Sequence, residues 1–251
     1  MHPKINEILD STKKRLPRHV NKKTNTASRD VLESIKARKK QKLIPVIAEV
    51  KPSSPTRFIR TVTPEDAAGI AVQMEKAGAA AISVLTEPEF FKGSIENLES
   101  VRNAVQLPVL RKDFIIDKTQ IYETESDLIL LIAGVLENKL NGFVDDAISC
   151  GLEPLVEVHN KNELETALST ATKIIGINNR DLNTLKVDIS TTEKLAPLAG
   201  GRIIVSESGI SAPEDALRMI DAGADAILVG TSIMQGNIYD KTYELVHALD
   251  R

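Results

Sequence analysis

Short apolar runs rich in isoleucine, valine and leucine recur along the chain, and longer segments with helical periodicity lie between them. Uninterrupted apolar runs of this length are typical of parallel strands that are covered on both faces. There are eight such runs: IPVIAEV from Ile44, AAISVLT from Ala80, PVLRKDF from Pro108, LILLIAG from Leu128, PLVEV from Pro154, IIGIN from Ile174, RIIVSES from Arg202 and AILVG from Ala226. Eight strands that alternate with helices predict a closed (β/α)8 barrel of the α/β class.

The helix boundaries support this prediction. The segment from Thr63 begins with a threonine cap, a proline at the first helical position and acidic residues in the first turn, and Gly78 ends it. The segment from Ala212 repeats this order, which indicates an internal repeat of the βα unit. An open doubly wound sheet is the main competitor, but no glycine-rich dinucleotide fingerprint follows the first strand.

The residues before the first strand contain two further predicted helices, INEILDSTKKRL from Ile5 and RDVLESIKARKK from Arg29. We interpret residues 1–42 as an N-terminal helical extension that packs on a barrel formed by residues 43–251. The length of 251 residues suits a single domain of this kind, since one such barrel needs roughly 250 residues.

The composition is that of an ordinary globular protein, with 42% hydrophobic and 27% charged residues. A net charge of -3 argues against nucleic acid as a partner, and the basic bias of the first 42 residues is best interpreted as a solvated helix face. No apolar run reaches the ~18–20 residues of a membrane helix, and the amino terminus lacks the apolar core of a signal peptide. We therefore expect a cytoplasmic protein that does not bind membranes.

Cysteine and histidine usage gives no sign of a metal site. The single cysteine, Cys150, excludes an intramolecular disulfide, fits a reducing compartment and is expected to be a small buried hydrophobic residue. The four histidines are far apart and show no ligand spacing. We predict that the chain binds no metal and is a monomer.

Polar residues interrupt the apolar runs repeatedly, and always near the carboxyl end. Glu49 and Lys51 are two residues apart, so a strand places both on the same face. Similar interruptions occur later in the chain, at Lys112, Asp113, Glu157, Asn178, Arg180, Glu207 and Ser208. A barrel gathers these ends at one face, where enzymes of this fold have their active sites. Buried charges are costly unless paired, so this repeated placement favours catalysis over a structural role.

The last two predicted strands end in the sequences SESGIS and LVGTSI. The glycines Gly209 and Gly230 and the neighbouring hydroxyl residues can expose backbone N–H groups to an anion. The loops after strands seven and eight are the usual phosphate position in such barrels. These residues therefore predict a small phosphorylated molecule as the ligand.

Six motifs within residues 44–235 resemble the indole-3-glycerol phosphate synthase family of tryptophan biosynthesis: IAEVKPSSP from Ile47, SVLTEPEFFKGS from Ser83, LRKDFIID from Leu110, LVEVH from Leu155, GINNRDL from Gly176 and SESGI from Ser206. The resemblance implies a (β/α)8 barrel with an N-terminal helical extension. It implies a carboxy-lyase that converts 1-(2-carboxyphenylamino)-1-deoxyribulose 5-phosphate into indole-3-glycerol phosphate, carbon dioxide and water. It implies that no cofactor is needed.

The resemblance also assigns catalytic roles. Lys112 is implied as the general acid that protonates the substrate carbonyl oxygen during ring closure. Glu157 is implied as the acid–base partner for the loss of water, and Lys51 as the group that orients the substrate carboxylate and protonates the leaving hydroxyl. Glu49 is expected to hold Lys51. We expect Lys51 to lie close to Lys112, and the pKa of Lys112 to be lowered by partial desolvation or by a neighbouring cation such as Lys51.

The remaining implied site residues bind and orient the substrate. Asn178 and Glu207 are expected at the reacting part, with electrostatic support from Arg180 and Ser208. The implied phosphate site consists of Ser54, Gly209, Gly230 and Thr231, and the apolar wall around the aromatic ring consists of Leu85, Phe91 and Phe114. The chain departs from the family pattern at Pro52, where a basic residue is common, and at Phe58, where a glycine is common.

Two other functions stay open on the residues alone. A desolvated lysine on a strand can form a Schiff base, so a class I aldolase or another phosphate-binding barrel enzyme is the chemical alternative. A noncatalytic barrel that only binds the ligand is the alternative from another class.

Overall fold

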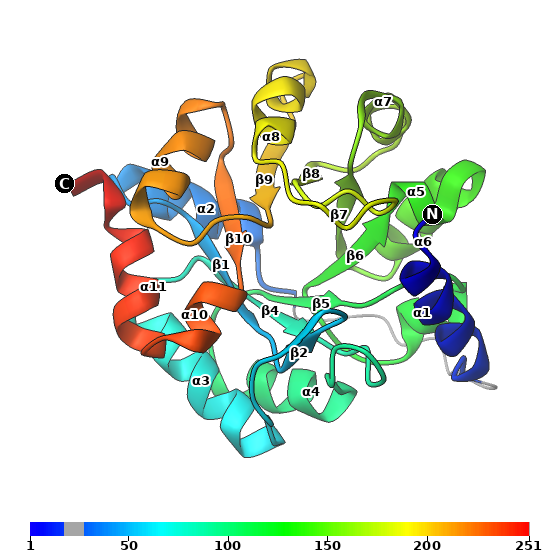
Figure 1. Ribbon diagram of the computed structural model, residues 1–251, viewed down its shortest axis with the longest axis horizontal. Coiled ribbons are helices and arrows are strands. Elements are labelled where there is room, and N and C mark those ends of the chain that lie inside the picture. Colours follow the sequence, from blue (N-terminus) through cyan, green and yellow to red (C-terminus); the bar gives the residue numbers. More distant parts are fainter. Residues whose placement is uncertain (18–27, 251) are drawn as a thin grey trace.

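A computed structural model describes residues 1–17 and 28–250, and it contains a closed barrel of eight parallel strands (Figure 1). The strands follow one another around the barrel in the order β1-β10-β9-β8-β7-β6-β5-β4. Their bounds are β1 Val46–Val50, β4 Ala81–Leu85, β5 Val109–Lys112, β6 Leu128–Ile132, β7 Glu153–Val158, β8 Ile174–Asn178, β9 Ile203–Glu207 and β10 Ala226–Val229. Each lies within or within one residue of a predicted apolar run, so the predicted strands are confirmed.

Helices surround the strands on the outside of the barrel (Figure 1). Their bounds are α3 Pro64–Lys76, α4 Ile95–Ala104, α5 Ala133–Leu136, α6 Leu140–Ser149, α7 Lys161–Leu168, α8 Ser190–Leu195, α9 Pro213–Asp221, α10 Thr231–Gln235 and α11 Ile238–Val246. The predicted caps are confirmed at α3, where Thr63 and Asp66 form a capping box. The outward strand faces and the inward helix faces form one large apolar core, to which Cys150 also belongs.

The connection from β5 to β6 departs from the repeating pattern. Residues 113–127 are all described, and they form a 3-10 helix, Lys118–Tyr122, in place of an α-helix. The buried guanidinium of Arg111 fixes this segment, because its Nη1 donates to the Gln120 carbonyl over 2.6 Å. Gln120 in turn accepts from the backbone N–H of Ile116 over 2.8 Å. Side-chain hydrogen bonds of Arg111 and Gln120 therefore stabilise this connection on the outside of the barrel.

Both helices predicted before the first strand are present, as α1 Pro3–Lys14 and α2 Val31–Lys40. They lie at opposite ends of the barrel. The His2 backbone N–H donates to the Leu182 carbonyl beyond β8, which places the start of α1 at the carboxyl ends of the strands. Ser34 and Arg38 of α2 donate to the carbonyls of Ala80 and Ala79 just before β4, at the amino ends. The part of the predicted basic segment that covers residues 18–27 lies outside the described residues.

The helix α2 closes the floor of the barrel. Val31 and Ile35 belong to the same buried cluster as Ile47, Ala81 and Leu128, whose side chains fill the barrel interior. Charged residues of α2 point outward, as Lys36 does with a side chain that is 59% exposed. Apolar burial on one face of α2 thus seals the end opposite the polar strand ends.

No helix in residues 1–17 or 28–250 is both long enough and apolar enough to cross a membrane.

The floor contact can be tested with Ile35→Ala. Ile35 is only 2% exposed, so its truncation leaves a cavity between α2 and the barrel. We expect the free energy of unfolding, measured by urea denaturation, to fall by about 2–5 kcal/mol. The matched variant Lys36→Ala on the same helix should change it by less than about 0.5 kcal/mol. Equal stability of the two variants would show that α2 does not seal the floor.

Candidate active site

A cavity of about 870 Å³, including the part open to solvent, lies at the carboxyl ends of the strands. This size suits a small-molecule ligand, for which cavities of roughly 300–1,000 Å³ are usual. Residues at or just beyond the ends of all eight strands line it. The predicted site residues among them are Lys51, Ser54, Leu85, Phe91, Lys112, Phe114, Glu157, Asn178, Arg180, Ser208 and Thr231.

Lys112, at the end of β5, lies among three carboxylates. Its Nζ is 2.5 Å from Glu207 Oε2, 3.8 Å from Glu49 Oε2 and 3.9 Å from Glu157 Oε2. Lys51 Nζ lies 3.4 Å from the other oxygen of Glu49. The structure therefore brings both lysines to one carboxylate, and Glu49 holds Lys51 as the sequence predicts.

The prediction that the pKa of Lys112 is lowered is wrong. Burial alone would lower the pKa of Lys112, but Glu207, Glu49 and Glu157 outweigh burial and raise that pKa above its ordinary value. The prediction considered only burial and the nearby cation Lys51 as influences on this pKa, and it left out the carboxylate of Glu207. Lys112 is thus fully protonated at neutral pH in the resting site.

The three carboxylates are not equivalent. Burial raises the pKa of Glu207 to about 7, with Glu157 acting in the same direction and Lys112 opposing it. Burial would also raise the pKa of Glu157, but the nearby His159, 3.2 Å away, and the charge of Lys112 lower it to about 2. Near neutral pH, Glu157 is a carboxylate while Glu207 is close to its titration point. Acidic groups whose pKa values are pushed apart in this way can give and accept protons separately.

Two glycines make room for these carboxylates. A Cβ atom added at Gly176, in β8, would lie 2.2 Å from Glu207 Oε1, an oxygen with no hydrogen-bond partner within the described chain. A Cβ added at Gly230, directly after β10, would lie 2.5 Å from Glu49 Oε1. Gly230 was predicted only as a phosphate residue, and its close approach to Glu49 is an additional constraint on that position.

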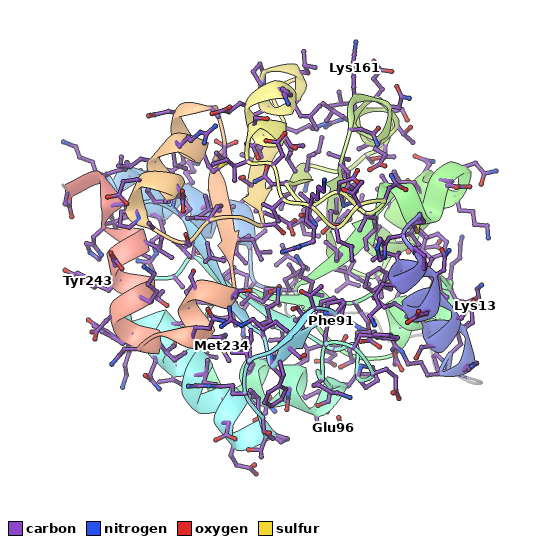
Figure 2. All side chains as sticks on the ribbon, viewed as in Figure 1. Lys13, Phe91, Glu96, Lys161, Met234 and Tyr243 are labelled. Atoms are coloured by element: carbon purple, nitrogen blue, oxygen red, sulfur yellow. The ribbon has the colours of Figure 1, made fainter. Side chains whose placement is uncertain are left out.

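One wall of the cavity is apolar, as predicted. The rings of Phe91 and Phe114 lie with centroids 6.2 Å apart, and Leu85 is buried beside the same cavity. Figure 2 shows Phe91 inside the ring of helices. The wall also includes five residues that sequence reasoning missed: Ile5, Leu130, Ile132, Leu182 and Leu185.

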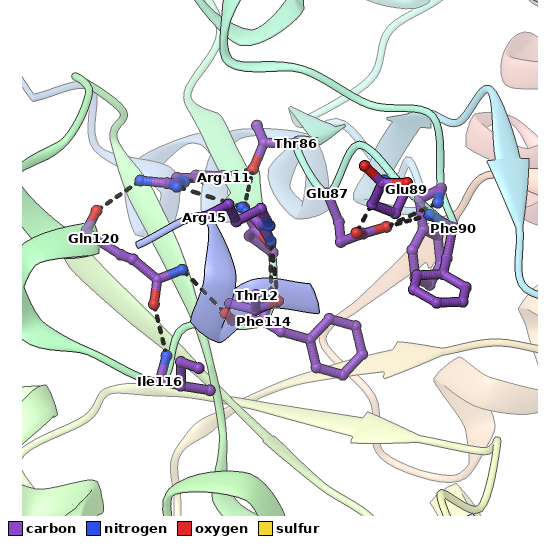
Figure 3. A network of polar contacts seen from close by, with 12 residues as sticks. Thr12, Arg15, Thr86, Glu87, Glu89, Phe90, Arg111, Phe114, Ile116 and Gln120 are labelled. Atoms are coloured by element: carbon purple, nitrogen blue, oxygen red, sulfur yellow. Dashed lines mark hydrogen bonds and ion pairs between the residues drawn. The ribbon is translucent and has the colours of Figure 1, made fainter. Parts of the chain in front are cut away.

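The buried carboxylate of Glu87 positions the Phe91 loop. Its two oxygens accept from the backbone N–H groups of Glu89, Phe90 and Phe91 over 2.8–3.0 Å (Figure 3). Glu87 lies within the motif SVLTEPEFFKGS but was not singled out, since its role depends on loop backbone groups.

The first helix is fastened to the strand that carries Lys112. Arg15, just beyond α1, donates to the buried Asp113 over 2.6 Å, and Asp113 also accepts from the Thr86 hydroxyl over 2.7 Å. Figure 3 shows Arg15 and Arg111 side by side in this network. Burial would raise the pKa of Asp113, but Arg111 and Arg15 hold it below its usual value. This ion pair fixes α1 over the cavity, where Ile5 forms part of the apolar wall.

The predicted phosphate residues lie at the side of β1, β9 and β10. Ser54 belongs to a small hairpin of β2 Ser53–Ser54 and β3 Arg57–Phe58, in which Phe58 is 62% exposed. Ser208 and Gly209 both have positive φ angles, 67° and 83°, which turn the chain sharply after β9. Gly230 precedes α10, and no described side chain caps that helix start. Ser54, Ser208 and Thr231 line the cavity, whereas Gly209 and Gly230 shape its loops.

The two remaining predicted residues are at the end of β8. Asn178 lines the cavity, and its side-chain oxygen accepts from the Arg180 backbone N–H over 3.0 Å. Arg180 donates to the Leu185 carbonyl over 2.9 Å.

His159, which contacts Glu157, was not predicted as a site residue. Its Nε2 lies 3.2 Å from Glu157 Oε1, and its Nδ1 lies 3.0 Å from Glu163 Oε2. Burial would lower the pKa of His159, but these two carboxylates raise it to about 10. The two-residue spacing from Glu157 along β7 was the available signal, because it places both side chains on one face.

The barrel and the charged groups at its strand ends define a (β/α)8-barrel enzyme whose site combines acid–base groups with a pocket for a small molecule. The family model of indole-3-glycerol phosphate synthase matches residues 2–245. The chain belongs to the indole-3-glycerol phosphate synthase family.

Relatives that share about half of their residues with this chain cover most of its length. An indole-3-glycerol phosphate synthase of Caldanaerobacter subterraneus is 50% identical over 197 residues, which is 76% of each chain. That of Aquifex aeolicus is 48% identical over 210 residues, or 80% of each chain. A solved N-acetylmannosamine-6-phosphate 2-epimerase from Clostridium perfringens covers 86% of this chain and 96% of its own, with a TM-score of 0.64. At 15% identity, that likeness concerns the fold alone.

The docking of α1 can be tested with Arg15→Ala. The substitution removes a charged partner from a buried carboxylate, so we expect a loss of about 2 kcal/mol in the free energy of unfolding at neutral pH. The folded pKa of Asp113 lies below its unfolded value of 3.8, so its ionisation stabilises the protein above that pH and ceases to do so as the pH falls through the folded pKa. The loss should therefore shrink below about pH 4.

Urea denaturation at two pH values measures this effect, and hydrogen exchange should show faster opening of residues 3–14. The control is Lys13→Ala, because the ion pair of Lys13 within residues 1–17 and 28–250 is an exposed one with Asp10. A loss that is the same at both pH values would contradict a role for the Asp113 charge.

Proposed function

We propose that this chain catalyses the reaction of its family through the residues around Lys112. The reaction converts 1-(2-carboxyphenylamino)-1-deoxyribulose 5-phosphate into indole-3-glycerol phosphate, carbon dioxide and water. The observation that carries the assignment of roles is the position of the Lys112 Nζ among three carboxylates, beside an apolar wall that suits an aromatic ring.

Ring closure needs an acid. The ring carbon that bears the carboxylate attacks the carbonyl carbon, a carbon–carbon bond forms, and the carbonyl oxygen takes a proton from Lys112. Loss of carbon dioxide then returns its bonding electrons to the ring. Because the pKa of Lys112 is raised, the resting lysine carries the proton that this step requires. A substrate that separates Lys112 from Glu207 would weaken the ion pair and ease the transfer.

Loss of water needs an acid and a base together. We assign the proton for the leaving hydroxyl to Lys51 and the removal of a proton from the new five-membered ring to Glu157. The low pKa of Glu157 supports this division, because that residue is ionised at neutral pH. Glu49 holds Lys51, while Asn178 and Glu207 orient the reacting atoms from β8 and β9.

Binding divides between the two sides of the cavity. We assign the phosphate to Ser54, Thr231 and the backbone around Gly209 and Gly230, in the loops that usually take phosphate in such barrels. Leu85, Phe91 and Phe114 are assigned to the aromatic ring. Arg180 and Ser208 are assigned electrostatic support of the substrate between these sides.

The protonation of Lys112 argues against a Schiff-base aldolase. Such an enzyme needs a neutral amine as nucleophile, whereas three carboxylates keep Lys112 an ammonium. Borohydride treatment with substrate would trap a Schiff base, and we expect no adduct.

We also propose that the protein works as a single-domain monomer in the cytoplasm. The helices α1 and α2 pack into the barrel at both ends, which supports a single domain. The lone buried cysteine fits a reducing compartment. Analytical ultracentrifugation tests the monomer.

The activity is tested by incubating the purified protein with the carboxyphenylamino-deoxyribulose phosphate and recording indole absorbance and fluorescence. We expect turnover by the parental protein and a fall in kcat of about 10²–10⁴-fold for Lys112→Ala, since the variant lacks the general acid. The control is Lys118→Ala, because Lys118 forms an exposed pair with Asp146 away from the cavity. Full turnover by Lys112→Ala would disprove its role.

The space around Glu49 is tested with Gly230→Ala. The added methyl group would push Glu49 away from both lysines, so we expect kcat to fall on the order of 10²-fold. The control is Gly69→Ala in α3, where no described atom lies within 4 Å of the added Cβ. That variant should keep its activity and gain about 0.5–1 kcal/mol of stability. Unchanged kinetics of Gly230→Ala would contradict the constraint.

A further inference from the structure

His159 is buried between two carboxylates that belong to different parts of the fold. It follows Glu157 by two residues at the end of β7, and its side chain is 3% exposed. Nε2 lies 3.2 Å from Glu157 Oε1, on the side of the cavity, and Nδ1 lies 3.0 Å from Glu163 Oε2, on α7. Glu157 lines the cavity, whereas the ring of His159 stands behind it.

Glu163 is held rigidly. Its Oε2 also accepts from the His159 backbone N–H over 2.8 Å, and its Oε1 accepts from the Asn160 amide over 2.7 Å. Asn160 in turn caps α7 by accepting from the Glu163 backbone N–H. Gly134 packs so closely that a Cβ there would lie 2.8 Å from Glu163 Oε1. The carboxylate of Glu163 is therefore a fixed anchor for the imidazole.

The arrangement determines the protonation state of the ring. A neutral imidazole has one N–H donor, so one of its nitrogens would present a lone pair to a carboxylate. Glu157 on β7 and Glu163 on α7 contact the ring, and Asp181 in the loop after β8 interacts with it electrostatically. Nδ1 is hydrogen-bonded to Glu163, and Nε2 lies at ion-pair distance from Glu157 Oε1 without forming a hydrogen bond, so a carboxylate beside each nitrogen stabilises the ring as an imidazolium.

We propose that His159 is a positioning residue for the reaction, and that the Glu163–His159 pair orients the Glu157 carboxylate towards Lys112 and the substrate and keeps it ionised. This inference rests on the proposed role of Glu157 as the base. It explains how a carboxylate among two other acidic side chains at the cavity stays an anion. The positive charge of Lys112 is shared among Glu157, Glu49 and Glu207. On the cavity side, His159 pairs with Glu157 and with no other of these carboxylates.

The central test is the pH dependence of kcat for His159→Gln. Glutamine is neutral, so Glu157 loses its dedicated cation and burial raises its pKa. We expect kcat to fall about ten- to a hundredfold at neutral pH, less than the ~10²–10⁴-fold loss on removing an acid–base group outright. The acid limb of the kcat profile should move to higher pH, with KM almost unchanged. A uniform fall with the parental pH profile would overturn the proposal.

Two further variants separate positioning from folding. Glu163→Gln keeps an oxygen that can accept from Nδ1 but removes the anchoring charge, so its acid limb should shift in the same direction and by less. Lys161→Gln changes a side chain that is 68% exposed and points away from the barrel (Figure 2), and it should match the parental protein. An acid limb of Glu163→Gln that shifts further than that of His159→Gln would contradict the proposed order of the contacts.

The protonation of the ring can be read without turnover. In protein labelled with ¹⁵N-histidine, the signal that disappears in His159→Gln should show two protonated nitrogens at pH values well above the ordinary histidine pKa of about 6.5. Titration of that signal near its ordinary pKa would overturn the proposal. If the parental protein formed no indole product, the proposed function would be wrong, and the ring signal would still decide whether an imidazolium holds Glu157.

Discussion

The ion pairs of Lys112 are the constraint on which the rest of the site depends. A charged ammonium and three carboxylates near the bottom of a barrel mouth would be unstable singly, because each would lose its hydration without compensation. Together they form a cluster in which Lys112 contacts every carboxylate and Lys51 contacts one of them. The barrel supplies the rigid frame, since Glu49 and Lys51 stand at the end of β1 and Lys112, Glu157 and Glu207 stand on β5, β7 and β9. The cluster therefore holds an acid, Lys112, and a base, Glu157, in one set of ion pairs that a bound substrate can separate.

The same electrostatics distinguish the carboxylates by their neighbours rather than by their chemistry. Glu157 has both His159 and Lys112 beside it, whereas the buried Glu207 has Lys112 as its cation and the like charges of Glu157 and Glu49 nearby. One therefore has a pKa of about 2 and the other a pKa of about 7.

The sequence predicts the barrel well because burial leaves a local trace: each strand is an apolar run, and helices such as α3 begin with a visible cap. It also predicts which polar residues meet, since the fold brings strand ends together. It fails where an effect depends on contacts across the barrel. The raised pKa of Lys112 requires Glu207, which is 95 residues away, and Asp113 is paired with Arg15 across 98 residues. The 3-10 segment after β5 is likewise hydrogen-bonded to the side chain of Arg111, a contact that no periodicity reveals.

The placement of α1 and α2 at opposite ends of the barrel has a consequence for synthesis. The helix α1 is translated well before Asp113 and Leu182, the residues that fasten it. Most of the chain must therefore be translated before the cover of the cavity can assume its place. The floor helix α2 has early partners at Ala79 and Ala80, and so it can settle long before the mouth is complete.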